Sequence, residues 1–287
     1  MKILLGCDVD PALPAPLTRP PVANIWQCLD NVERFLDAAG GTLPPITWLI
    51  RADESVRFST DCFDSGYLSR QQLWQSLASR GHELGWHFHL MSYDKARGSF
   101  GFDADPAWLS SAHHAIAAHF AVRATRTGWD YGSDVLLRRL DALGIVVDFS
   151  ALPGHIGWQW AGSDKLRVDW SRCPKTPYHP SSDDYQRPGE LALLEVPITP
   201  FVNSFAGMVK RLGWRLRNGS GSIAGLRSKT RMLTQPWTGL PSSHSPVWAF
   251  FFHPEDLDRQ GIEEGLRNLR RLQSMPDAEF VRASAVL

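Results

Sequence analysis

The length, composition and charge of the chain set the first limits. Its 287 residues are 43% hydrophobic, which suffices for one large α/β domain or two small ones. Lysine plus arginine (30) equals aspartate plus glutamate (30), so no global field indicates a nucleic-acid partner or an acidic substrate. The cysteines, at positions 7, 28, 62 and 173, lack Cys-x-x-Cys spacing, which favours reduced cytoplasmic thiols. No apolar run has the length of a secretory leader or a membrane span.

Strand-like and helix-like runs alternate along the chain, which predicts a parallel sheet covered by helices. Gly40, Gly81 and Gly144 each follow a helical stripe of apolar residues and are expected to end it. Residues 153–189 are rich in proline, tryptophan and aspartate and are expected to be a long loop. The expected strands span residues 3–10, 46–50, 81–89, 125–130, 145–150, 193–198 and 247–253, with a short one at 280–281; the expected helices span residues 25–36, 70–80, 106–120, 134–143 and 260–272.

These elements predict an α/β fold with about seven pairs of parallel strand and helix, one fewer than in a full (β/α) barrel. No linker and no internal repeat divides the chain, so we expect a single domain over residues 1–287. A basic amphipathic stretch at about residues 203–235 is expected to be an insertion in that fold.

Side-chain parity brings polar residues of two strands to one place. Successive side chains of a strand point to opposite faces, so Asp8 and Asp10 share one face of the first strand. His87 and His89 likewise share one face of the strand at 81–89. Imidazoles and carboxylates are usual zinc ligands, and catalytic zinc sites keep one position open. The sequence therefore predicts a divalent metal site. Cys7 falls on the apolar face and is expected in the core.

Later strands also end in polar side chains. Arg126, Asp148 and His253 stand at or near the ends of their strands. In a barrel of parallel strands the active site lies at the C-terminal strand ends, so these residues are expected to converge on the same mouth.

Five motifs in sequence resemble the polysaccharide deacetylases of carbohydrate esterase family four, which share the NodB-homology domain. The resemblance runs from residue 3 to about residue 256 in the family's motif order. It implies a seven-stranded distorted barrel and hydrolysis of an N- or O-acyl group from a sugar with the help of a divalent metal, usually zinc. The motifs are CDVD, GHELGWHFH, RTGWDYGSDVLLRRLDALGIVVDFSALPG, YHPSSDDYQRPG with LLEVP, and FFFHPED.

Carried onto this chain, the resemblance makes Asp8 the general base and Asp10 and His87 metal ligands. The family's second histidine usually stands four residues after the first, where this chain has Met91. His89 is therefore expected to serve as the third ligand, because it shares a face with His87.

The resemblance also assigns the remaining roles. Arg126 pairs with the base, His253 protonates the leaving group, and Asp148 orients His253. The family's Arg-Pro-Pro-Tyr segment supplies an oxyanion donor; here the segment is RTGWDY, so the donor differs. Trp129 and Tyr131 are expected to contact the sugar, and packing of the barrel mouth is an equal alternative for Trp129.

The stretch from Phe205 to Met232 holds seven lysines and arginines and no acid. Its apolar residues fall on one helical face, which is typical of a helix that lies on anionic lipid headgroups. The alternative is an ordinary helix packed on the barrel. The membrane hypothesis describes a cytoplasmic protein, peripheral at the inner membrane face, that acts on a lipid-linked sugar.

The sequence thus predicts a zinc-dependent hydrolase that removes an acyl group, acetyl first of all, from a sugar, polysaccharide or lipid-linked glycan of cell-envelope synthesis. Two alternatives remain. One is a cyclic-amide hydrolase with the same fold. The other is a catalytically silent carbohydrate-binding barrel, which would fit the altered histidine spacing and the 12 tryptophans.

Overall fold

The computed structural model describes residues 1–13, 24–41, 43–202, 209, 228–229, 232–237, 239–241 and 244–286. Its centre is an eight-stranded sheet in which seven strands follow the order β10-β7-β6-β3-β2-β1-β13, with β14 beside β1. All pairings in this sheet are parallel. The strands are β1 (Lys2–Val9), β2 (Thr47–Arg51), β3 (Glu83–Phe88), β6 (Ala124–Thr127), β7 (Val147–Asp148), β10 (Leu194–Glu195), β13 (Val247–Phe252) and β14 (Glu279–Val281).

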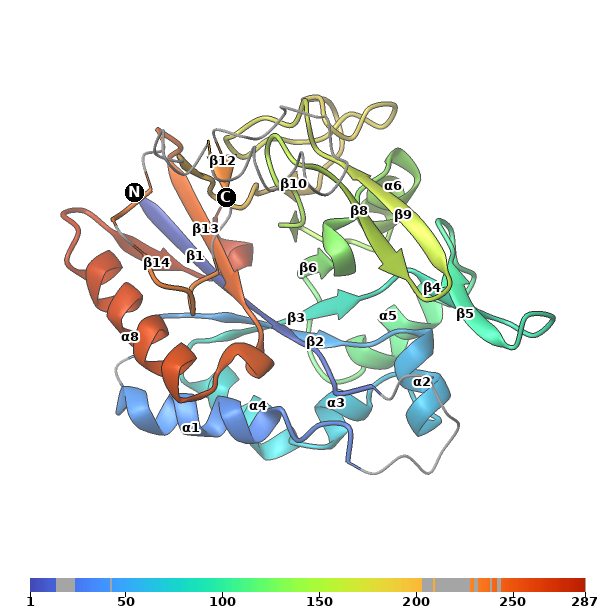
Figure 1. The fold of residues 1–287 in the computed structure, drawn as a ribbon, viewed down its shortest axis with the longest axis horizontal. Coiled ribbons are helices and arrows are strands. Elements are labelled where there is room, and N and C mark those ends of the chain that lie inside the picture. Colours follow the sequence, from blue (N-terminus) through green and yellow to red (C-terminus); the bar gives the residue numbers. More distant parts are fainter. Residues whose placement is uncertain are drawn as a thin grey trace.

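The sheet curls into a half-barrel with helices around it, which confirms the predicted distorted α/β barrel (Figure 1). Irregular backbone joins the two ends of the curl. The amide of Thr199, beyond β10, donates to the carbonyl of Ala249 in β13 at 2.9 Å, and the amide of Ala249 donates to Oγ1 of Thr199 at 2.8 Å. Loop segments therefore occupy the position of an eighth barrel strand.

The five predicted helices are present, with ends that differ by a few residues. In α1, the buried residues Leu29, Val32 and Phe35 face the sheet, and Gly40 ends the helix at φ 62°. Two further helices, α2 (Glu54–Thr60) and α3 (Ser65–Leu68), lie between β2 and α4. The predicted five are α1 (Leu29–Ala39), α4 (Gln71–Ser79), α5 (Leu109–Ala117), α6 (Asp134–Ala142) and α8 (Arg259–Gln273).

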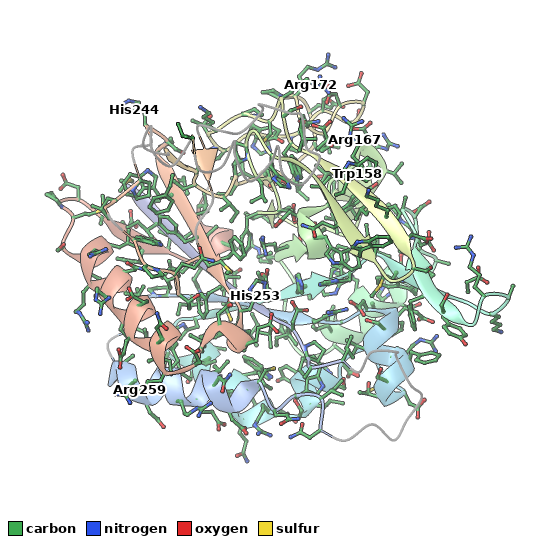
Figure 2. All side chains as sticks on the ribbon, in the orientation of Figure 1. Trp158, Arg167, Arg172, His244, His253 and Arg259 are labelled. Atoms are coloured by element: carbon green, nitrogen blue, oxygen red, sulfur yellow. The ribbon has the colours of Figure 1, made fainter. Side chains whose placement is uncertain are left out.

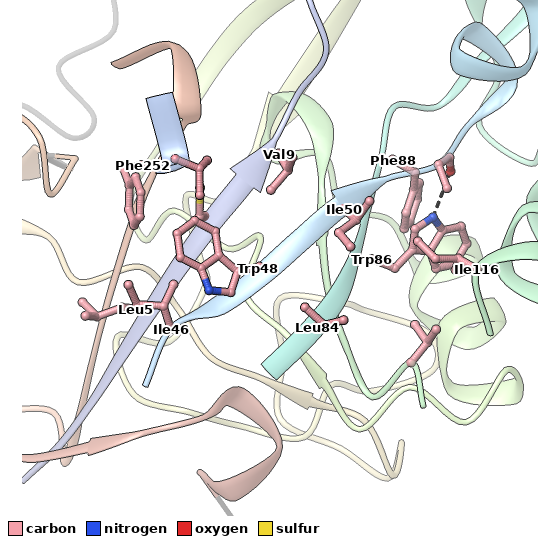
Figure 3. Close-up of a cluster of buried hydrophobic side chains, with 14 of the residues drawn as sticks. Leu5, Val9, Ile46, Trp48, Ile50, Leu84, Trp86, Phe88, Ile116 and Phe252 are labelled. Atoms are coloured by element: carbon pink, nitrogen blue, oxygen red, sulfur yellow. Dashed lines mark hydrogen bonds between the residues drawn. The ribbon is translucent and has the colours of Figure 1, made fainter. Parts of the chain in front are cut away.

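The largest apolar cluster lies between the sheet and the helices (Figure 3). Trp48 of β2 contacts Phe252 of β13 edge-on, with ring centroids 6.0 Å apart. Trp86 of β3 donates its indole N–H to the carbonyl of Ala52 at 2.9 Å. Cys7 is fully buried in this cluster, as its position on the apolar face predicted. Since a second apolar cluster occupies the other face of the sheet, both faces are covered, as in parallel sheets generally.

Three predicted strands are shorter than expected, and the one predicted over 193–198 is reduced to Leu194–Glu195. The strand predicted over 125–130 ends at Thr127, because Trp129 and Asp130 have φ values of 58° and 55° and turn the chain. The strand predicted over 145–150 is reduced to Val147–Asp148.

The long loop predicted over 153–189 was wrong in part, because it contains an antiparallel hairpin of β8 (Ile156–Ala161) and β9 (Asp164–Asp169). A second hairpin, β4 (Met91–Asp94) with β5 (Ser99–Phe102), follows β3. A third small pairing joins β11 (Phe201–Val202) to β12 (Ser228–Lys229).

Most of the basic stretch, including residues 203–208 and 210–227, lies outside the described residues. The amphipathic helix predicted there stays a prediction. Among the helices that the structure does describe, none combines the length and the apolar character needed to cross a bilayer.

His82 lies just before β3 and has a structural role. Its Nδ1 accepts the amide hydrogen of Ile46 at 3.1 Å, and its ring contacts that of Trp48. Burial, and then the nearby Arg80, lowers the pKa of His82 to about 4. The ring therefore stays neutral in the native protein well below the pH at which an unfolded histidine is protonated.

This burial predicts a loss of stability in acid. The contribution of a neutral His82 is complete above about pH 6.5 and is lost as the pH falls towards 4, because only the unfolded chain binds the proton in that range. His82→Asn keeps an acceptor for the Ile46 amide but does not titrate. Between pH 7 and pH 4, the free energy of unfolding of the wild type relative to this variant should fall by up to about 3 kcal/mol. Urea denaturation at each pH measures it, and a constant difference would contradict the prediction.

Candidate active site

Polar side chains from four strand ends meet at one cavity of about 340 Å³ at the C-terminal edge of the sheet. The strands are β1, β3, β6 and β13, and His253 lies near the centre of the molecule in Figure 2. The cavity brings together the predicted site residues except Asp148 and Tyr131. Its lining consists of Asp8, Asp10, His87, His89, Arg126, Gly128, Trp129, Asp130, Met232, Gln235, Phe251 and His253.

Asp10, His87 and His89 direct three donor atoms at one point. The Nε2 atoms of the two histidines are 3.1 Å apart, and each lies 3.5 Å from Oδ1 of Asp10. A tetrahedral metal with ligand bonds of about 2.0–2.2 Å places its ligands about 3.3–3.6 Å from one another. The three donors therefore fit a divalent metal such as zinc, with a fourth position left for a water or substrate atom.

The protonation of these side chains suits metal binding. Nδ1 of His87 lies 2.6 Å from the carbonyl oxygen of Arg126, so it carries the ring proton and leaves the Nε2 lone pair free. Burial, and then Arg51, lowers the pKa of His89 to about 4, which keeps that ring neutral. Burial raises the pKa of Asp10, but His87 and then Arg51 outweigh it and hold that pKa well below its usual range.

Arg51 and Asp53 support the three donors, and sequence reasoning missed both. Arg51 donates from Nη1 to Oδ1 of Asp10 at 2.8 Å and from Nε to Oδ2 of Asp53 at 2.7 Å. The same Oδ2 accepts the backbone amide of His89 at 2.9 Å. One buried pair thus fixes the Asp10 side chain and the His89 backbone. The signal was present, because Arg51 ends an apolar strand as the other site residues do.

Asp8 and Arg126 form the second half of the site. Nη1 of Arg126 donates to Oδ2 of Asp8, and Nη2 donates to Asp130. The Arg126 guanidinium carbon lies 3.8 Å from the centre of the Phe251 ring. Oδ1 of Asp8 is buried and has no hydrogen-bond partner among the described residues. A carboxylate held by arginine, with one oxygen unpaired, is suited to accept a proton.

His253 lies next to this pair. Its Nε2 is 3.6 Å from Oδ2 of Asp8, and its Nδ1 is 3.0 Å from Oδ2 of Asp256. The sequence assigned the orienting carboxylate to Asp148, and the structure gives that position to Asp256. The reason is local: a 3₁₀ turn, η2 (Pro254–Asp256), follows β13 and brings the carboxylate back to the ring.

Asp148 is instead buried inside the barrel. Its Oδ1 accepts the hydroxyls of Thr125 at 2.8 Å and Ser150 at 3.1 Å. Glu195 stands beside it in the register of β10 with β7. Burial, and then the Asp148 carboxylate, raises the pKa of Glu195 well above its usual range. These two carboxyl groups belong to the interior and do not line the cavity.

The two predicted sugar contacts differ in position. Trp129 lines the cavity, and its ring lies 4.3 Å from that of His89 at an interplanar angle of 71°. Tyr131 packs edge-on against Phe102, with centroids 5.0 Å apart, and does not line the cavity. Of the two, only Trp129 is placed to contact a ligand of this cavity.

Met91 lies away from the metal donors. It begins β4, is buried, and belongs to the same apolar cluster as Phe100. His89, two residues earlier in the chain, is the imidazole that lies beside His87.

No family model matches the sequence, and neither does any curated protein. Among solved structures, a protein of Mycobacterium smegmatis assigned provisionally as a polysaccharide deacetylase is 16% identical, with 96% of this chain and 85% of that one covered at a TM-score of 0.50. A provisionally assigned polysaccharide deacetylase of O-antigen biosynthesis from Bordetella bronchiseptica is 14% identical (96% and 86% covered, TM-score 0.37). The α-amylase AmyC of Thermotoga maritima is 10% identical (99% and 74% covered, TM-score 0.48). The likeness to the first of these is one of fold, and it agrees with the fold expected from the sequence motifs.

The choice of His89 over residue 91 can be tested by zinc binding. His89→Ala should weaken Zn²⁺ binding by more than the roughly 10–100-fold that follows loss of an outer partner. Adding Met91→His to that variant should not restore it, since residue 91 lies in an apolar cluster. Titration calorimetry with Zn²⁺ measures both, and recovery of affinity in the double variant would contradict the assignment.

Gly128 provides a second test. A Cβ atom there would lie 2.2 Å from Cδ2 of His89, so Gly128→Ala must displace the histidine ring. We expect about a tenfold or greater loss of zinc affinity, with an unchanged circular dichroism spectrum. Gly239→Ala is the matched control, because its Cβ meets nothing within 4 Å. Equal zinc affinity in the two variants would show that the position of His89 does not matter.

Proposed function

We propose that this chain is a metal-dependent hydrolase of the polysaccharide deacetylase kind, which removes an acyl group, acetyl first of all, from a sugar or glycan. One observation carries the proposal: a three-donor cation site shares a cavity with an arginine-held carboxylate and a carboxylate-held histidine. This is the set of groups that metal-assisted acyl hydrolysis uses, namely a cation site, a base and an acid. The likeness of fold to a provisionally assigned deacetylase supports it.

Asp10, His87 and His89 would hold the metal, and zinc is the ion we propose. When bound there, a divalent metal lowers the pKa of a coordinated water towards about 7 and polarises the acyl carbonyl.

Asp8 is the proposed base. Its unpaired Oδ1 would take a proton from the attacking water, while Arg126 on Oδ2 keeps the side chain fixed and favours the carboxylate form. Asp130 holds the other side of the Arg126 guanidinium, so the arginine cannot turn away from Asp8 without losing an ion pair.

His253 is the proposed acid. Asp256 binds its Nδ1 and so directs Nε2 towards the cavity, where it would give its proton to the departing amine or alkoxide. Nε2 of His253 lies 3.6 Å from Oδ2 of Asp8, so acid and base would act on one scissile bond. Trp129 would form a wall against the apolar face of the sugar ring.

The substrate we propose is an acylated sugar, polysaccharide or lipid-linked glycan intermediate of cell-envelope synthesis. With a lipid-linked substrate, the basic stretch at 205–232 would hold the enzyme at the inner membrane face. These finer proposals rest on the sequence alone.

The reaction is tested with the zinc-loaded protein. It should release acetate from N-acetylglucosamine oligomers or from O-acetylated sugars. Asp8→Asn should lower kcat/KM by about 10²–10⁴ with zinc affinity unchanged, because a base is lost and the cation site is kept. Asp10→Asn, the matched variant two residues away, should lose zinc and activity together.

The same assay separates the alternatives. Opening of a cyclic ureide without acetate release would replace this proposal by cyclic-amide hydrolysis. Zinc binding without turnover of any of these substrates, or no zinc binding at all, would favour a silent carbohydrate-binding barrel. Full activity of Asp8→Asn would remove Asp8 from the base role.

A further inference from the structure

The outer face of β8 exposes two indole rings. Trp158 and Trp160 are 58% and 68% exposed, the largest hydrophobic side chains that the described part of the chain presents to solvent. They stand two residues apart on one strand, so they lie on the same side of the hairpin. Trp170, the third tryptophan of the expected loop, is fully buried.

Two cationic side chains of β9 are the cross-strand neighbours of these rings. Arg167 pairs in register with Trp158, and Lys165 pairs with Trp160, so all four side chains share one face. Nζ of Lys165 lies 4.9 Å from the centre of the Trp158 ring, and no carboxylate of the described residues forms an ion pair with it. Arg167 makes an exposed ion pair with Asp169 at 2.8 Å. We call Trp158, Trp160, Lys165 and Arg167 the indole platform.

The hairpin that carries the platform is packed against the protein through its opposite face. Leu166 and Val168, on the opposite face of β9, are buried in the apolar cluster that fills the barrel side of the sheet. The chain leaving the hairpin reaches Trp170, whose indole N–H donates to the carbonyl of Asp130 at 2.6 Å. Asp130 lines the cavity, so the chain just after the hairpin is tied to the cavity wall.

We infer that the indole platform binds an acidic polysaccharide, at a site separate from the catalytic cavity. Indole faces pack on the apolar faces of sugar rings, and two rings about 7 Å apart along a strand suit a chain of sugars more than a single one. Lysine and arginine beside them match carboxylate or phosphate groups on that chain. The face carries no exposed aliphatic side chain between the indoles, which favours a sugar polymer over a bilayer. This inference rests on the proposed function, since it extends the same substrate.

Affinity gel electrophoresis of the full chain tests it, with polygalacturonate, its neutral methyl ester, or no polymer in the gel. Polygalacturonate should retard the wild type more than the ester does. Trp158→Ala/Trp160→Ala and Lys165→Gln/Arg167→Gln should each bind about tenfold more weakly. Arg259→Gln, an exposed arginine on α8, is the matched control and should bind as the wild type does. All variants should keep the wild-type circular dichroism spectrum, because the four side chains are exposed.

Several outcomes would overturn the inference. These are no retardation, equal retardation by the neutral ester, or retardation unchanged in both platform variants. Binding to phosphatidylglycerol vesicles that depends on the platform, without polysaccharide binding, would assign the surface to lipid instead. The binding assay does not require turnover. Retardation by polygalacturonate can therefore be observed in the wild type and in Asp8→Asn even if neither protein hydrolyses an acylated sugar, so the two hypotheses can fail separately. If hydrolysis succeeds, the platform variants should raise KM for acetylated polymer and leave the turnover of a short acetylated sugar unchanged.

Discussion

A buried arginine between two aspartates holds the candidate cation site in shape. Arg51 and Asp53 are almost wholly removed from water, and burying such charges costs several kcal/mol each unless their hydrogen bonds are complete. Here they are nearly so, because Arg51 binds Asp10, Asp53 and Ser55, while Asp53 also caps α2 and binds the His89 amide. Such a network adds little net stability. Its effect is to fix geometry, because the hydrogen-bonded pair of Arg51 and Asp53 holds both the Asp10 oxygen and the His89 backbone in place.

Asp8 and Asp10 show how neighbours divide the work of two similar side chains. They stand two residues apart on one strand face, yet Asp10 meets two imidazoles and Arg51, whereas Asp8 meets Arg126 and approaches His253. A cation bound by Asp10, His87 and His89 would neutralise the Asp10 carboxylate, while Asp8 would stay paired with Arg126. With the proposed function, the site would therefore separate a cation half from a proton-transfer half without needing different residue types.

Features of the site that follow from the two-residue period of a β-strand could be predicted from the sequence. Features that depend on irregular backbone could not. Alternation alone places His87 and His89 on one side, and their Nε2 atoms indeed meet at 3.1 Å. It could not show that a 3₁₀ turn returns Asp256 to His253, or that positive φ values at Trp129 and Asp130 turn the chain. Asp148, which lies in the regular strand β7, was misplaced for a different reason, because parity fixes the face of a side chain and not its reach.

The irregular segments are also those that shape the cavity beyond its reactive centre. Where an eighth strand would close the barrel, Met232 and Gln235 line the cavity instead. Their segment is fixed by the amide of Leu233, which donates to the carbonyl of Phe251 at 2.9 Å, and by Asn268 of α8, which binds the carbonyls of Leu233 and Gln235. On another side the hairpin β8–β9 is tied to Asp130. Strand ends thus carry the candidate reactive groups, while inserted segments, free to vary without disturbing the sheet, form the surfaces that a substrate would meet first.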